Sequence, residues 1–260
     1  MNLTSFRWET APQLGVIQLL LATFIPSGIA CIAFHVILPS IVRSGLPVLV
    51  AWSAVASMAL LAFLVVAVGL LRTEARRLGV TLWSRMCLTN PPLRLWLLAA
   101  GVFAVVVILS WPVGLVVVPV MQVVGFNVPD YMPFFLNPEI DPLTTDMTVL
   151  SPDLPLRGRY ALLPLVGVTL VLNILTEELY FRAWMLPKLS RYGVWGWAIN
   201  GVLFAFYHLF QLWLLPVLLV VSLGSALICY LTRSIWPAFA AHLILNMLAL
   251  VGLLTLILGL

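Results

Sequence analysis

The chain has 260 residues, of which 63% are apolar and 8% are charged, and its formal net charge is +4. Soluble domains average about 45–50% apolar and about 25% charged residues, so this composition excludes an ordinary soluble domain and indicates a protein embedded in a bilayer. The basic residues are scattered and mostly flank apolar stretches, a distribution that does not favour nucleic-acid binding.

Apolar stretches of about 20 residues recur along the chain, and each is long enough to cross a hydrocarbon core of about 30 Å. Because backbone groups in lipid must bond internally, the spans should be helices, and we expect an all-α polytopic integral membrane protein with about seven to eight transmembrane helices. The first run lacks the features of a cleaved signal, so it should be a retained helix. The expected spans lie near residues 16–39, 46–71, 95–121, 160–182, 195–213, 215–232 and 236–258.

Prolines punctuate two of these spans. Pro112 lies inside the third span and should kink or split it, because proline removes a helix hydrogen bond. The fifth and sixth spans form one apolar stretch, and Pro216 predicts a tight turn near 211–216. The Pro-rich segment 126–158 is expected to include a short interfacial piece at YMPFF.

Charged loops predict how the chain sits in the membrane. The segment 72–94 carries five arginines, and such loops lie in the cytoplasm. We therefore expect a cytoplasmic N-terminus, an external C-terminus and a location in a cell membrane, of the bacterial inner or plasma-membrane type. The segment 126–158 should lie outside, and its acidic residues are Asp130, Glu139, Asp141, Asp146 and Asp153.

Two glutamates and an arginine stand inside the fourth span, in TEELYFRAW at 176–184. Ionisable groups inside spans are costly and usually mark function. Side chains of neighbouring helix residues point about 100° apart, whereas residues four apart share a face. Arg182 should therefore hold Glu178 as a structural group and leave Glu177 free to act as a general base. The alternative is that all three charges cap a helix end at the cytoplasmic interface.

Further polar residues follow in the later spans. Phe204 and His208 are four residues apart in FAFYHL, and His242 and Asn246 are four apart in HLILN. Each pair alone is equally consistent with polar contacts between membrane helices. A carboxylate and a histidine can deprotonate water, and a histidine and an amide can stabilise an oxyanion, so the set indicates amide hydrolysis without a covalent intermediate. His35 stands alone and should be structural.

Three motifs in order resemble a known family. EELYFR at 177–182 fits EExxxR, FAFYH at 204–208 fits FxxxH, and HLILN at 242–246 fits HxxxN. This order and spacing resemble the CAAX prenyl proteases and bacteriocin-processing or immunity proteins, which are glutamic intramembrane proteases. We expect one transmembrane domain over 1–260, with family-variable helices in 1–150 and a catalytic core in 160–250.

The resemblance implies a role for each matching residue. Glu177 would activate water together with His208, while His242 and Asn246 would form the oxyanion hole. No cofactor would be needed, and the substrate would be a peptide or lipidated protein segment held in the lipid bilayer. Supporting roles would fall to Glu178, Arg182 and Phe204.

Two other functions remain open from the sequence. A metal-dependent membrane hydrolase could use Glu177, His208 and His242 as zinc ligands, although the chain contains no HExxH motif. A non-enzymatic membrane protein, such as an immunity protein or a peptide-export partner, could use the same residues for helix packing. The three cysteines of the chain lie in separate segments and indicate neither a disulfide framework nor a zinc site.

Overall fold

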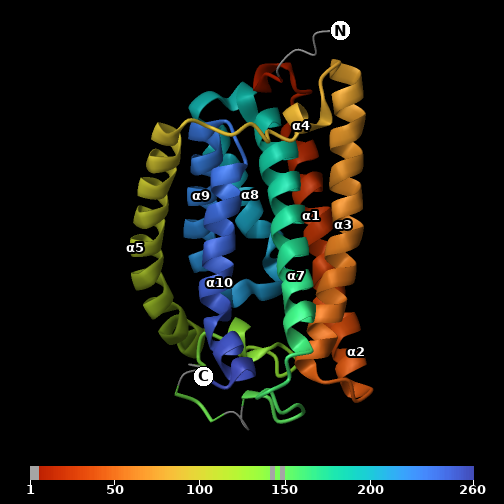
Figure 1. Ribbon diagram of the computed structural model, residues 1–260, viewed down its shortest axis with the longest axis vertical. Coiled ribbons are helices and arrows are strands. Elements are labelled where there is room, and N and C mark those ends of the chain that lie inside the picture. Colours follow the sequence, from red (N-terminus) through yellow and green to blue (C-terminus); the bar gives the residue numbers. More distant parts are fainter. Residues whose placement is uncertain (1–5, 141–143, 147–149) are drawn as a thin grey trace.

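A computed structural model describes residues 6–140, 144–146 and 150–260, and within these ranges it contains helices and loops but no strand. The long helices stand side by side as a bundle (Figure 1). The all-α prediction is therefore confirmed. Asp141, one of the acidic residues expected outside the membrane, lies outside the described residues.

The bundle contains long helices joined by short ones. The longest is α5, with α3 next to it in length. The α-helices are α1 (Val16–Ile32), α2 (Leu38–Arg43), α3 (Val48–Leu78), α4 (Leu82–Arg85), α5 (Leu93–Val124), α7 (Leu162–Glu177), α8 (Gly196–Tyr207), α9 (Leu215–Thr232) and α10 (Trp236–Leu258). The π-helical and 3₁₀ segments are η1 (Trp8–Thr10), η2 (Ala33–Ile37), η3 (Phe134–Leu136), η4 (Glu178–Met185), η5 (Leu186–Trp195) and η6 (Leu209–Leu214).

Six helical stretches in the described part of the chain are long and apolar enough to cross a membrane. One of them, Leu162–Tyr207, has 46 residues and would be about 69 Å long if straight, far more than one crossing needs. The chain reverses within this stretch at Gly193, whose φ of 57° and ψ of −132° are not helical. The stretch therefore accounts for two of the expected spans, and the observed number roughly matches the prediction.

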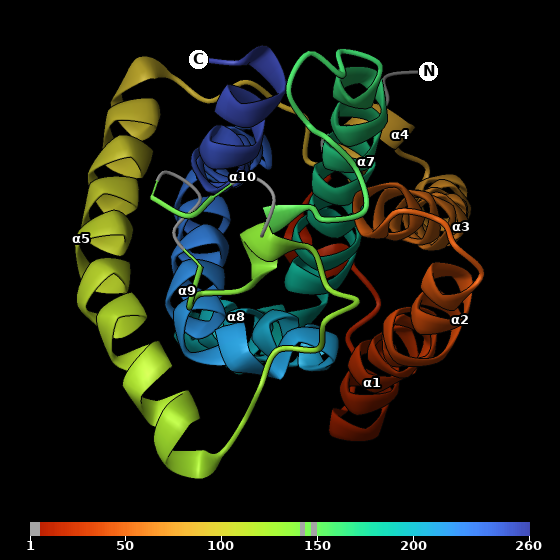
Figure 2. The same ribbon diagram turned by 90° about the horizontal axis from the view of Figure 1, so that it is seen from below.

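Of the two outcomes expected at Pro112, a kink or a split of the span, the split does not occur. α5 continues through both Pro112 and Pro119 as one helix of 32 residues, and it bows outward in Figure 2. A bend of this kind accommodates the missing hydrogen bonds without ending the helix. α5 forms one side of the molecule and packs on α9, whereas α3 packs on α7 at the opposite side (Figure 2).

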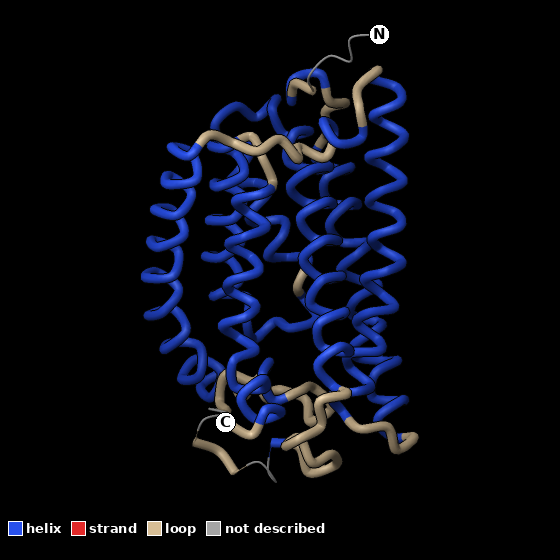
Figure 3. The backbone as a smooth tube through the Cα atoms, viewed as in Figure 1, coloured by secondary structure: helices blue, strands red, loops and turns tan. Residues whose placement is uncertain are grey.

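The fifth span differs from its expected course of 195–213. α8 has only 12 residues and ends at Tyr207, and the turn η6 then leads into α9 within the bundle (Figure 3). Backbone groups of such a turn need protein partners at membrane depth. His35 supplies one by donating from Nε2 to the Phe210 carbonyl over 2.9 Å, while its Nδ1 lies 3.0 Å from the Tyr131 hydroxyl. His35 is thus structural, as expected.

Small residues allow α8 and α9 to approach closely. A Cβ atom added at Gly201 would lie 2.7 Å from the Cα of Leu223, and one at Gly224 would lie 2.1 Å from a methyl group of Val106. α9 is therefore held tightly between α8 and α5. η1 and the 72–94 segment lie at one end of the bundle, and the C-terminus and the described parts of the 126–158 segment lie at the other (Figure 1). These relative positions are the ones that the charged loops predicted.

Candidate active site

The four residues expected to be catalytic come together from three helical regions. Glu177 ends α7, His208 follows the last residue of α8, and His242 and Asn246 lie on α10. The His208 Nε2 lies 3.5 Å from Glu177 Oε1, and the His242 Nε2 lies 3.7 Å from Glu177 Oε2. Glu177 is 2% exposed and His208 is 5% exposed, so the site is buried inside the protein.

The hydrogen bonds of His208 define which ring nitrogen faces the carboxylate. Its Nδ1 lies 2.9 Å from the Phe204 carbonyl, which can only accept, so Nδ1 carries a proton. In the neutral ring the Nε2 lone pair then faces Glu177. Phe204 contacts the same ring edge-on, with 4.8 Å between centroids, as the four-residue spacing predicted.

Glu178 contacts both His242 and Arg182. Its Oε1 accepts from the His242 Nδ1 over 3.0 Å, whereas its Oε2 lies 3.9 Å from the Arg182 Nε and has no hydrogen-bond partner. The pairing with Arg182 exists only as a long contact. Although neighbouring side chains on one helix point about 100° apart, both glutamates contact His242, whose ring lies between them and meets one carboxylate with each nitrogen.

Arg182 stabilises the site through other partners. It is fully buried and donates to the Ser225 hydroxyl and to the side-chain amide oxygen of Asn200 over 3.3 Å each. Its guanidinium lies 4.3 Å from the centre of the Phe204 ring, a cation–π contact that holds this ring beside His208. All three charges of the motif are buried, which does not favour the alternative that they cap an exposed helix end at the interface.

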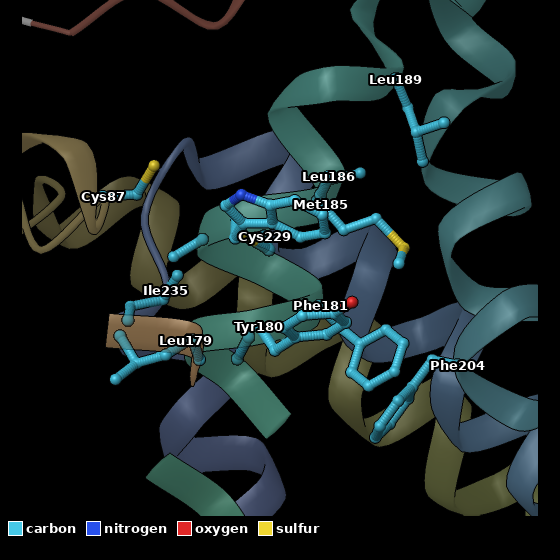
Figure 4. Packing of buried hydrophobic residues seen from close by; sticks show 14 of the residues in the cluster. Cys87, Leu179, Tyr180, Phe181, Met185, Leu186, Leu189, Phe204, Cys229 and Ile235 are labelled. Carbon is cyan, nitrogen blue, oxygen red and sulfur yellow. The ribbon is translucent and has the colours of Figure 1, made fainter. Parts of the chain in front are cut away.

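The helix that carries the two glutamates changes form within the motif. α7 ends at Glu177, and η4 continues from Glu178 to Met185 as a π-helix. π-helical turns often occur at functional sites, and here the turn packs an aromatic cluster against α8 (Figure 4). Phe181 and Phe204 face each other with 4.7 Å between ring centroids. This packing fixes the position of the glutamates relative to α8.

Asn173 is a site residue that the sequence prediction left out of the catalytic set. It lies one turn before Glu177 and donates from Nδ2 to Glu177 Oε1 over 2.9 Å. Its Oδ1 accepts from the Asn246 Nδ2 over 3.3 Å. The signal was available, because Asn173 and Glu177 are four residues apart and share a helix face.

A second feature missing from the sequence prediction is a buried ion cluster next to the motif. Glu74 on α3 accepts from Arg85 Nε and Nη2 over 3.0 and 2.6 Å, from Trp184 Nε1 over 3.0 Å, and from Lys188. Arg85 also donates to the Ala183 carbonyl over 2.6 Å. The cluster therefore ties α3 and α4 in the N-terminal part of the chain to the π-helix η4.

A cavity of about 840 Å³ extends from the four side chains into the bundle. α1, α3, α5, α7, α8, α9 and α10 all contribute to its walls, which are mostly apolar. Glu177, His208, His242 and Asn246 lie together in this lining. Across the part of the chain that is described, no three His, Cys, Asp or Glu side chains are arranged to hold a metal ion.

A comparison with protein families finds a match for one region of the chain. The family described as type II CAAX prenyl endopeptidase Rce1-like matches residues 159–248. No curated protein and no solved structure matches the chain. The matched region contains every site residue expected from the three motifs. The match therefore confirms that residues 159–248 resemble the CAAX prenyl protease and bacteriocin-processing family, as those motifs predicted.

Proposed function

We propose that this protein is a glutamic-type intramembrane endopeptidase that cleaves a membrane-tethered or lipidated protein segment. The observation that carries the proposal is the convergence of Glu177 with two imidazoles and an amide beside an apolar cavity. The resemblance to CAAX prenyl endopeptidases supports the same reaction class.

Glu177 and His208 hold the attacking water in this proposal. Glu177 Oε1 and the unprotonated Nε2 of His208 are both acceptors and lie 3.5 Å apart. One water molecule can donate a hydrogen bond to each of them, and this satisfies both acceptors at once. Glu177 takes a proton as the water oxygen attacks the peptide carbonyl carbon.

The remaining groups stabilise the charge that develops. The carbonyl oxygen becomes an oxyanion, which His242 and Asn246 stabilise by donating hydrogen bonds. Collapse of this intermediate breaks the carbon–nitrogen bond, and the proton held by Glu177 passes to the leaving amine. The reaction adds one water across the peptide bond and leaves a carboxylate and an amine, without a covalent enzyme intermediate.

Glu178 has a defined part in this scheme. Because its carboxylate accepts from His242 Nδ1, a neutral His242 has no proton on Nε2 to donate. Donation from Nε2 to an oxyanion therefore requires the imidazolium form. Glu177 and Glu178 flank this ring and balance its positive charge. Glu178 thus positions His242 as a cationic donor.

The cavity accounts for the proposed substrate class. Its mostly apolar walls suit a lipid chain or an apolar peptide segment, because such ligands lose little by leaving water for an apolar cavity. We place the N-terminus in the cytoplasm and the protein in a cell membrane, because the arginine-rich 72–94 segment should remain on the cytoplasmic side. No cofactor takes part in the proposed steps.

A comparison of peptide termini tests the proposal directly. Cells that produce the intact protein or its Glu177→Gln variant are compared for membrane peptide termini. A terminus that depends on Glu177 supports hydrolysis and identifies the substrate. Glu9→Gln is the matched control, because Glu9 lies far along the chain from the site and is exposed. If both glutamine variants produce the same termini as the intact protein, the proposed activity is wrong.

A further inference from the structure

Asn173 lies between the two halves of the proposed machinery. Its amide nitrogen donates to Glu177, the proposed base, over 2.9 Å. Its amide oxygen accepts from Asn246, the proposed oxyanion donor, over 3.3 Å. Neither asparagine side chain has another hydrogen bond to the described residues. All three side chains line the same cavity.

The chemistry of Glu177 dictates the direction of this chain of hydrogen bonds. An ionised carboxylate only accepts, so the Asn173 side chain must turn its NH₂ group towards Glu177. Its carbonyl oxygen then faces Asn246. A carbonyl oxygen also only accepts, so Asn246 must turn its own NH₂ group towards Asn173. The charge on Glu177 therefore fixes the orientation of two amides in series.

This orientation matters because an amide group has two different ends. The NH₂ group of Asn246 carries two hydrogens, and Asn173 takes only one of them. The second hydrogen remains available to a reacting carbonyl oxygen. With no partner at position 173, the Asn246 amide could turn over and place its own oxygen towards the oxyanion, where it would repel rather than stabilise the charge.

We infer that Asn173 is a positioning residue: the Glu177 carboxylate orients its amide, and this amide orients Asn246 as an oxyanion donor. This inference rests on the proposed function. It adds a residue outside the three motifs and gives a physical reason for an amide at this position. Asn173 itself does not touch the reacting bond, so its loss should slow the chemical step without weakening substrate binding.

Two substitutions of Asn173 and one control test the inference. Asn173→Leu keeps the size of the side chain and removes both polar ends, and Asn173→Asp keeps the shape and removes the donor. Asn90→Leu is the control, because it makes the same change at an exposed asparagine that does not line the cavity. The Asn90 side chain accepts a hydrogen bond from Trp96 Nε1, away from Glu177.

The first readout is the rate at which the Glu177-dependent terminus accumulates in cells. Hydrogen bonds to charged groups contribute about 1.5–3 kcal/mol, so each Asn173 variant should slow cleavage by about 10- to 100-fold. Asn90→Leu should match the intact protein. With the identified peptide and purified protein in liposomes, kcat should fall and KM should change less than about twofold.

The second readout separates positioning from a general structural effect. If Asn173 acts through Asn246, Asn173→Leu should reduce the cleavage rate by a smaller factor in an Asn246→Ala variant than in the intact protein. The two reductions in rate then do not multiply, because both substitutions remove the same contribution. The inference is overturned if the double variant loses the full product of the two single reductions in rate, or if Asn173→Leu cleaves at the rate of the intact protein. Asn173→Asp provides the same test where the leucine variant does not accumulate. Absence of any Glu177-dependent terminus would instead refute the proposed function.

Discussion

Replacing Glu74 by glutamine is expected to destabilise the bundle by about 3–5 kcal/mol. Glu74 is the carboxylate that faces both Arg85 and Lys188, whose side chains are 0% and 2% exposed. Glutamine keeps the shape but removes the negative charge, so two buried cations lose their counter-charge. Breaking a buried ion pair by removing one partner costs this much because the remaining charge is left uncompensated.

The hydrogen bonds of the cluster point to the same magnitude. A glutamine amide has one acceptor oxygen, whereas the Glu74 carboxylate accepts from Arg85, Trp184 and Lys188 through both of its oxygens. The NH₂ group of glutamine would also face a cation. For a chain of this size, about 3–5 kcal/mol corresponds to a fall of roughly 6–20 °C in the apparent melting temperature.

The assay is thermal unfolding of the purified protein in detergent, followed by tryptophan fluorescence. Glu9→Gln is the control, because the Arg7–Glu9 pair is 3.8 Å long and its side chains are 77% and 60% exposed. Exposed pairs contribute little, so this variant should melt within about 2 °C of the intact protein. Equal melting of Glu74→Gln and the intact protein would refute the reasoning.

Three further outcomes are expected. Gly201→Ala should lower the melting temperature, because its Cβ would lie 2.7 Å from the Leu223 Cα and cost about 1–3 kcal/mol, whereas Gly28→Ala has open space and should not. Burial raises the pKa of the Cys87 thiol to about 11, so the thiol stays neutral at pH 7.5. Peptide mapping should find Cys87 unlabelled by a maleimide at pH 7.5 and increasingly labelled as the pH approaches 11. Rapid labelling at pH 7.5 contradicts that burial. Hydrolysis should continue in the presence of 1,10-phenanthroline, and loss of activity that zinc restores would favour the metal-dependent alternative.

The helical class and the site region could be predicted because their signals are local. Span length and apolar content follow from the bilayer, and the four-residue spacings of Phe204 with His208 and of His242 with Asn246 place each pair on one face. The family match over 159–248 confirms the resemblance that these motifs predicted for this region. The roles of the individual residues remain predictions.

Other features depend on tertiary packing that the sequence does not reveal. The ring of His242 reaches both Glu177 and Glu178 because α10 packs against the end of α7, which no spacing within one helix predicts. α8 ends at Tyr207 because the turn η6 finds partners such as His35 inside the bundle. The Glu74 cluster joins residues more than 100 positions apart.

The most direct measurement of the central claim is hydrolysis of the identified peptide by purified protein in liposomes. The intact protein is compared with Glu177→Gln and His208→Ala, with folding of each variant checked by its melting temperature. We predict that the intact protein releases the product and that both variants lose about 10²-fold or more in kcat. Glu177→Gln removes the base that takes the proton of the water, and His208→Ala removes an acceptor for that water. Turnover by folded Glu177→Gln at the intact rate would contradict the account.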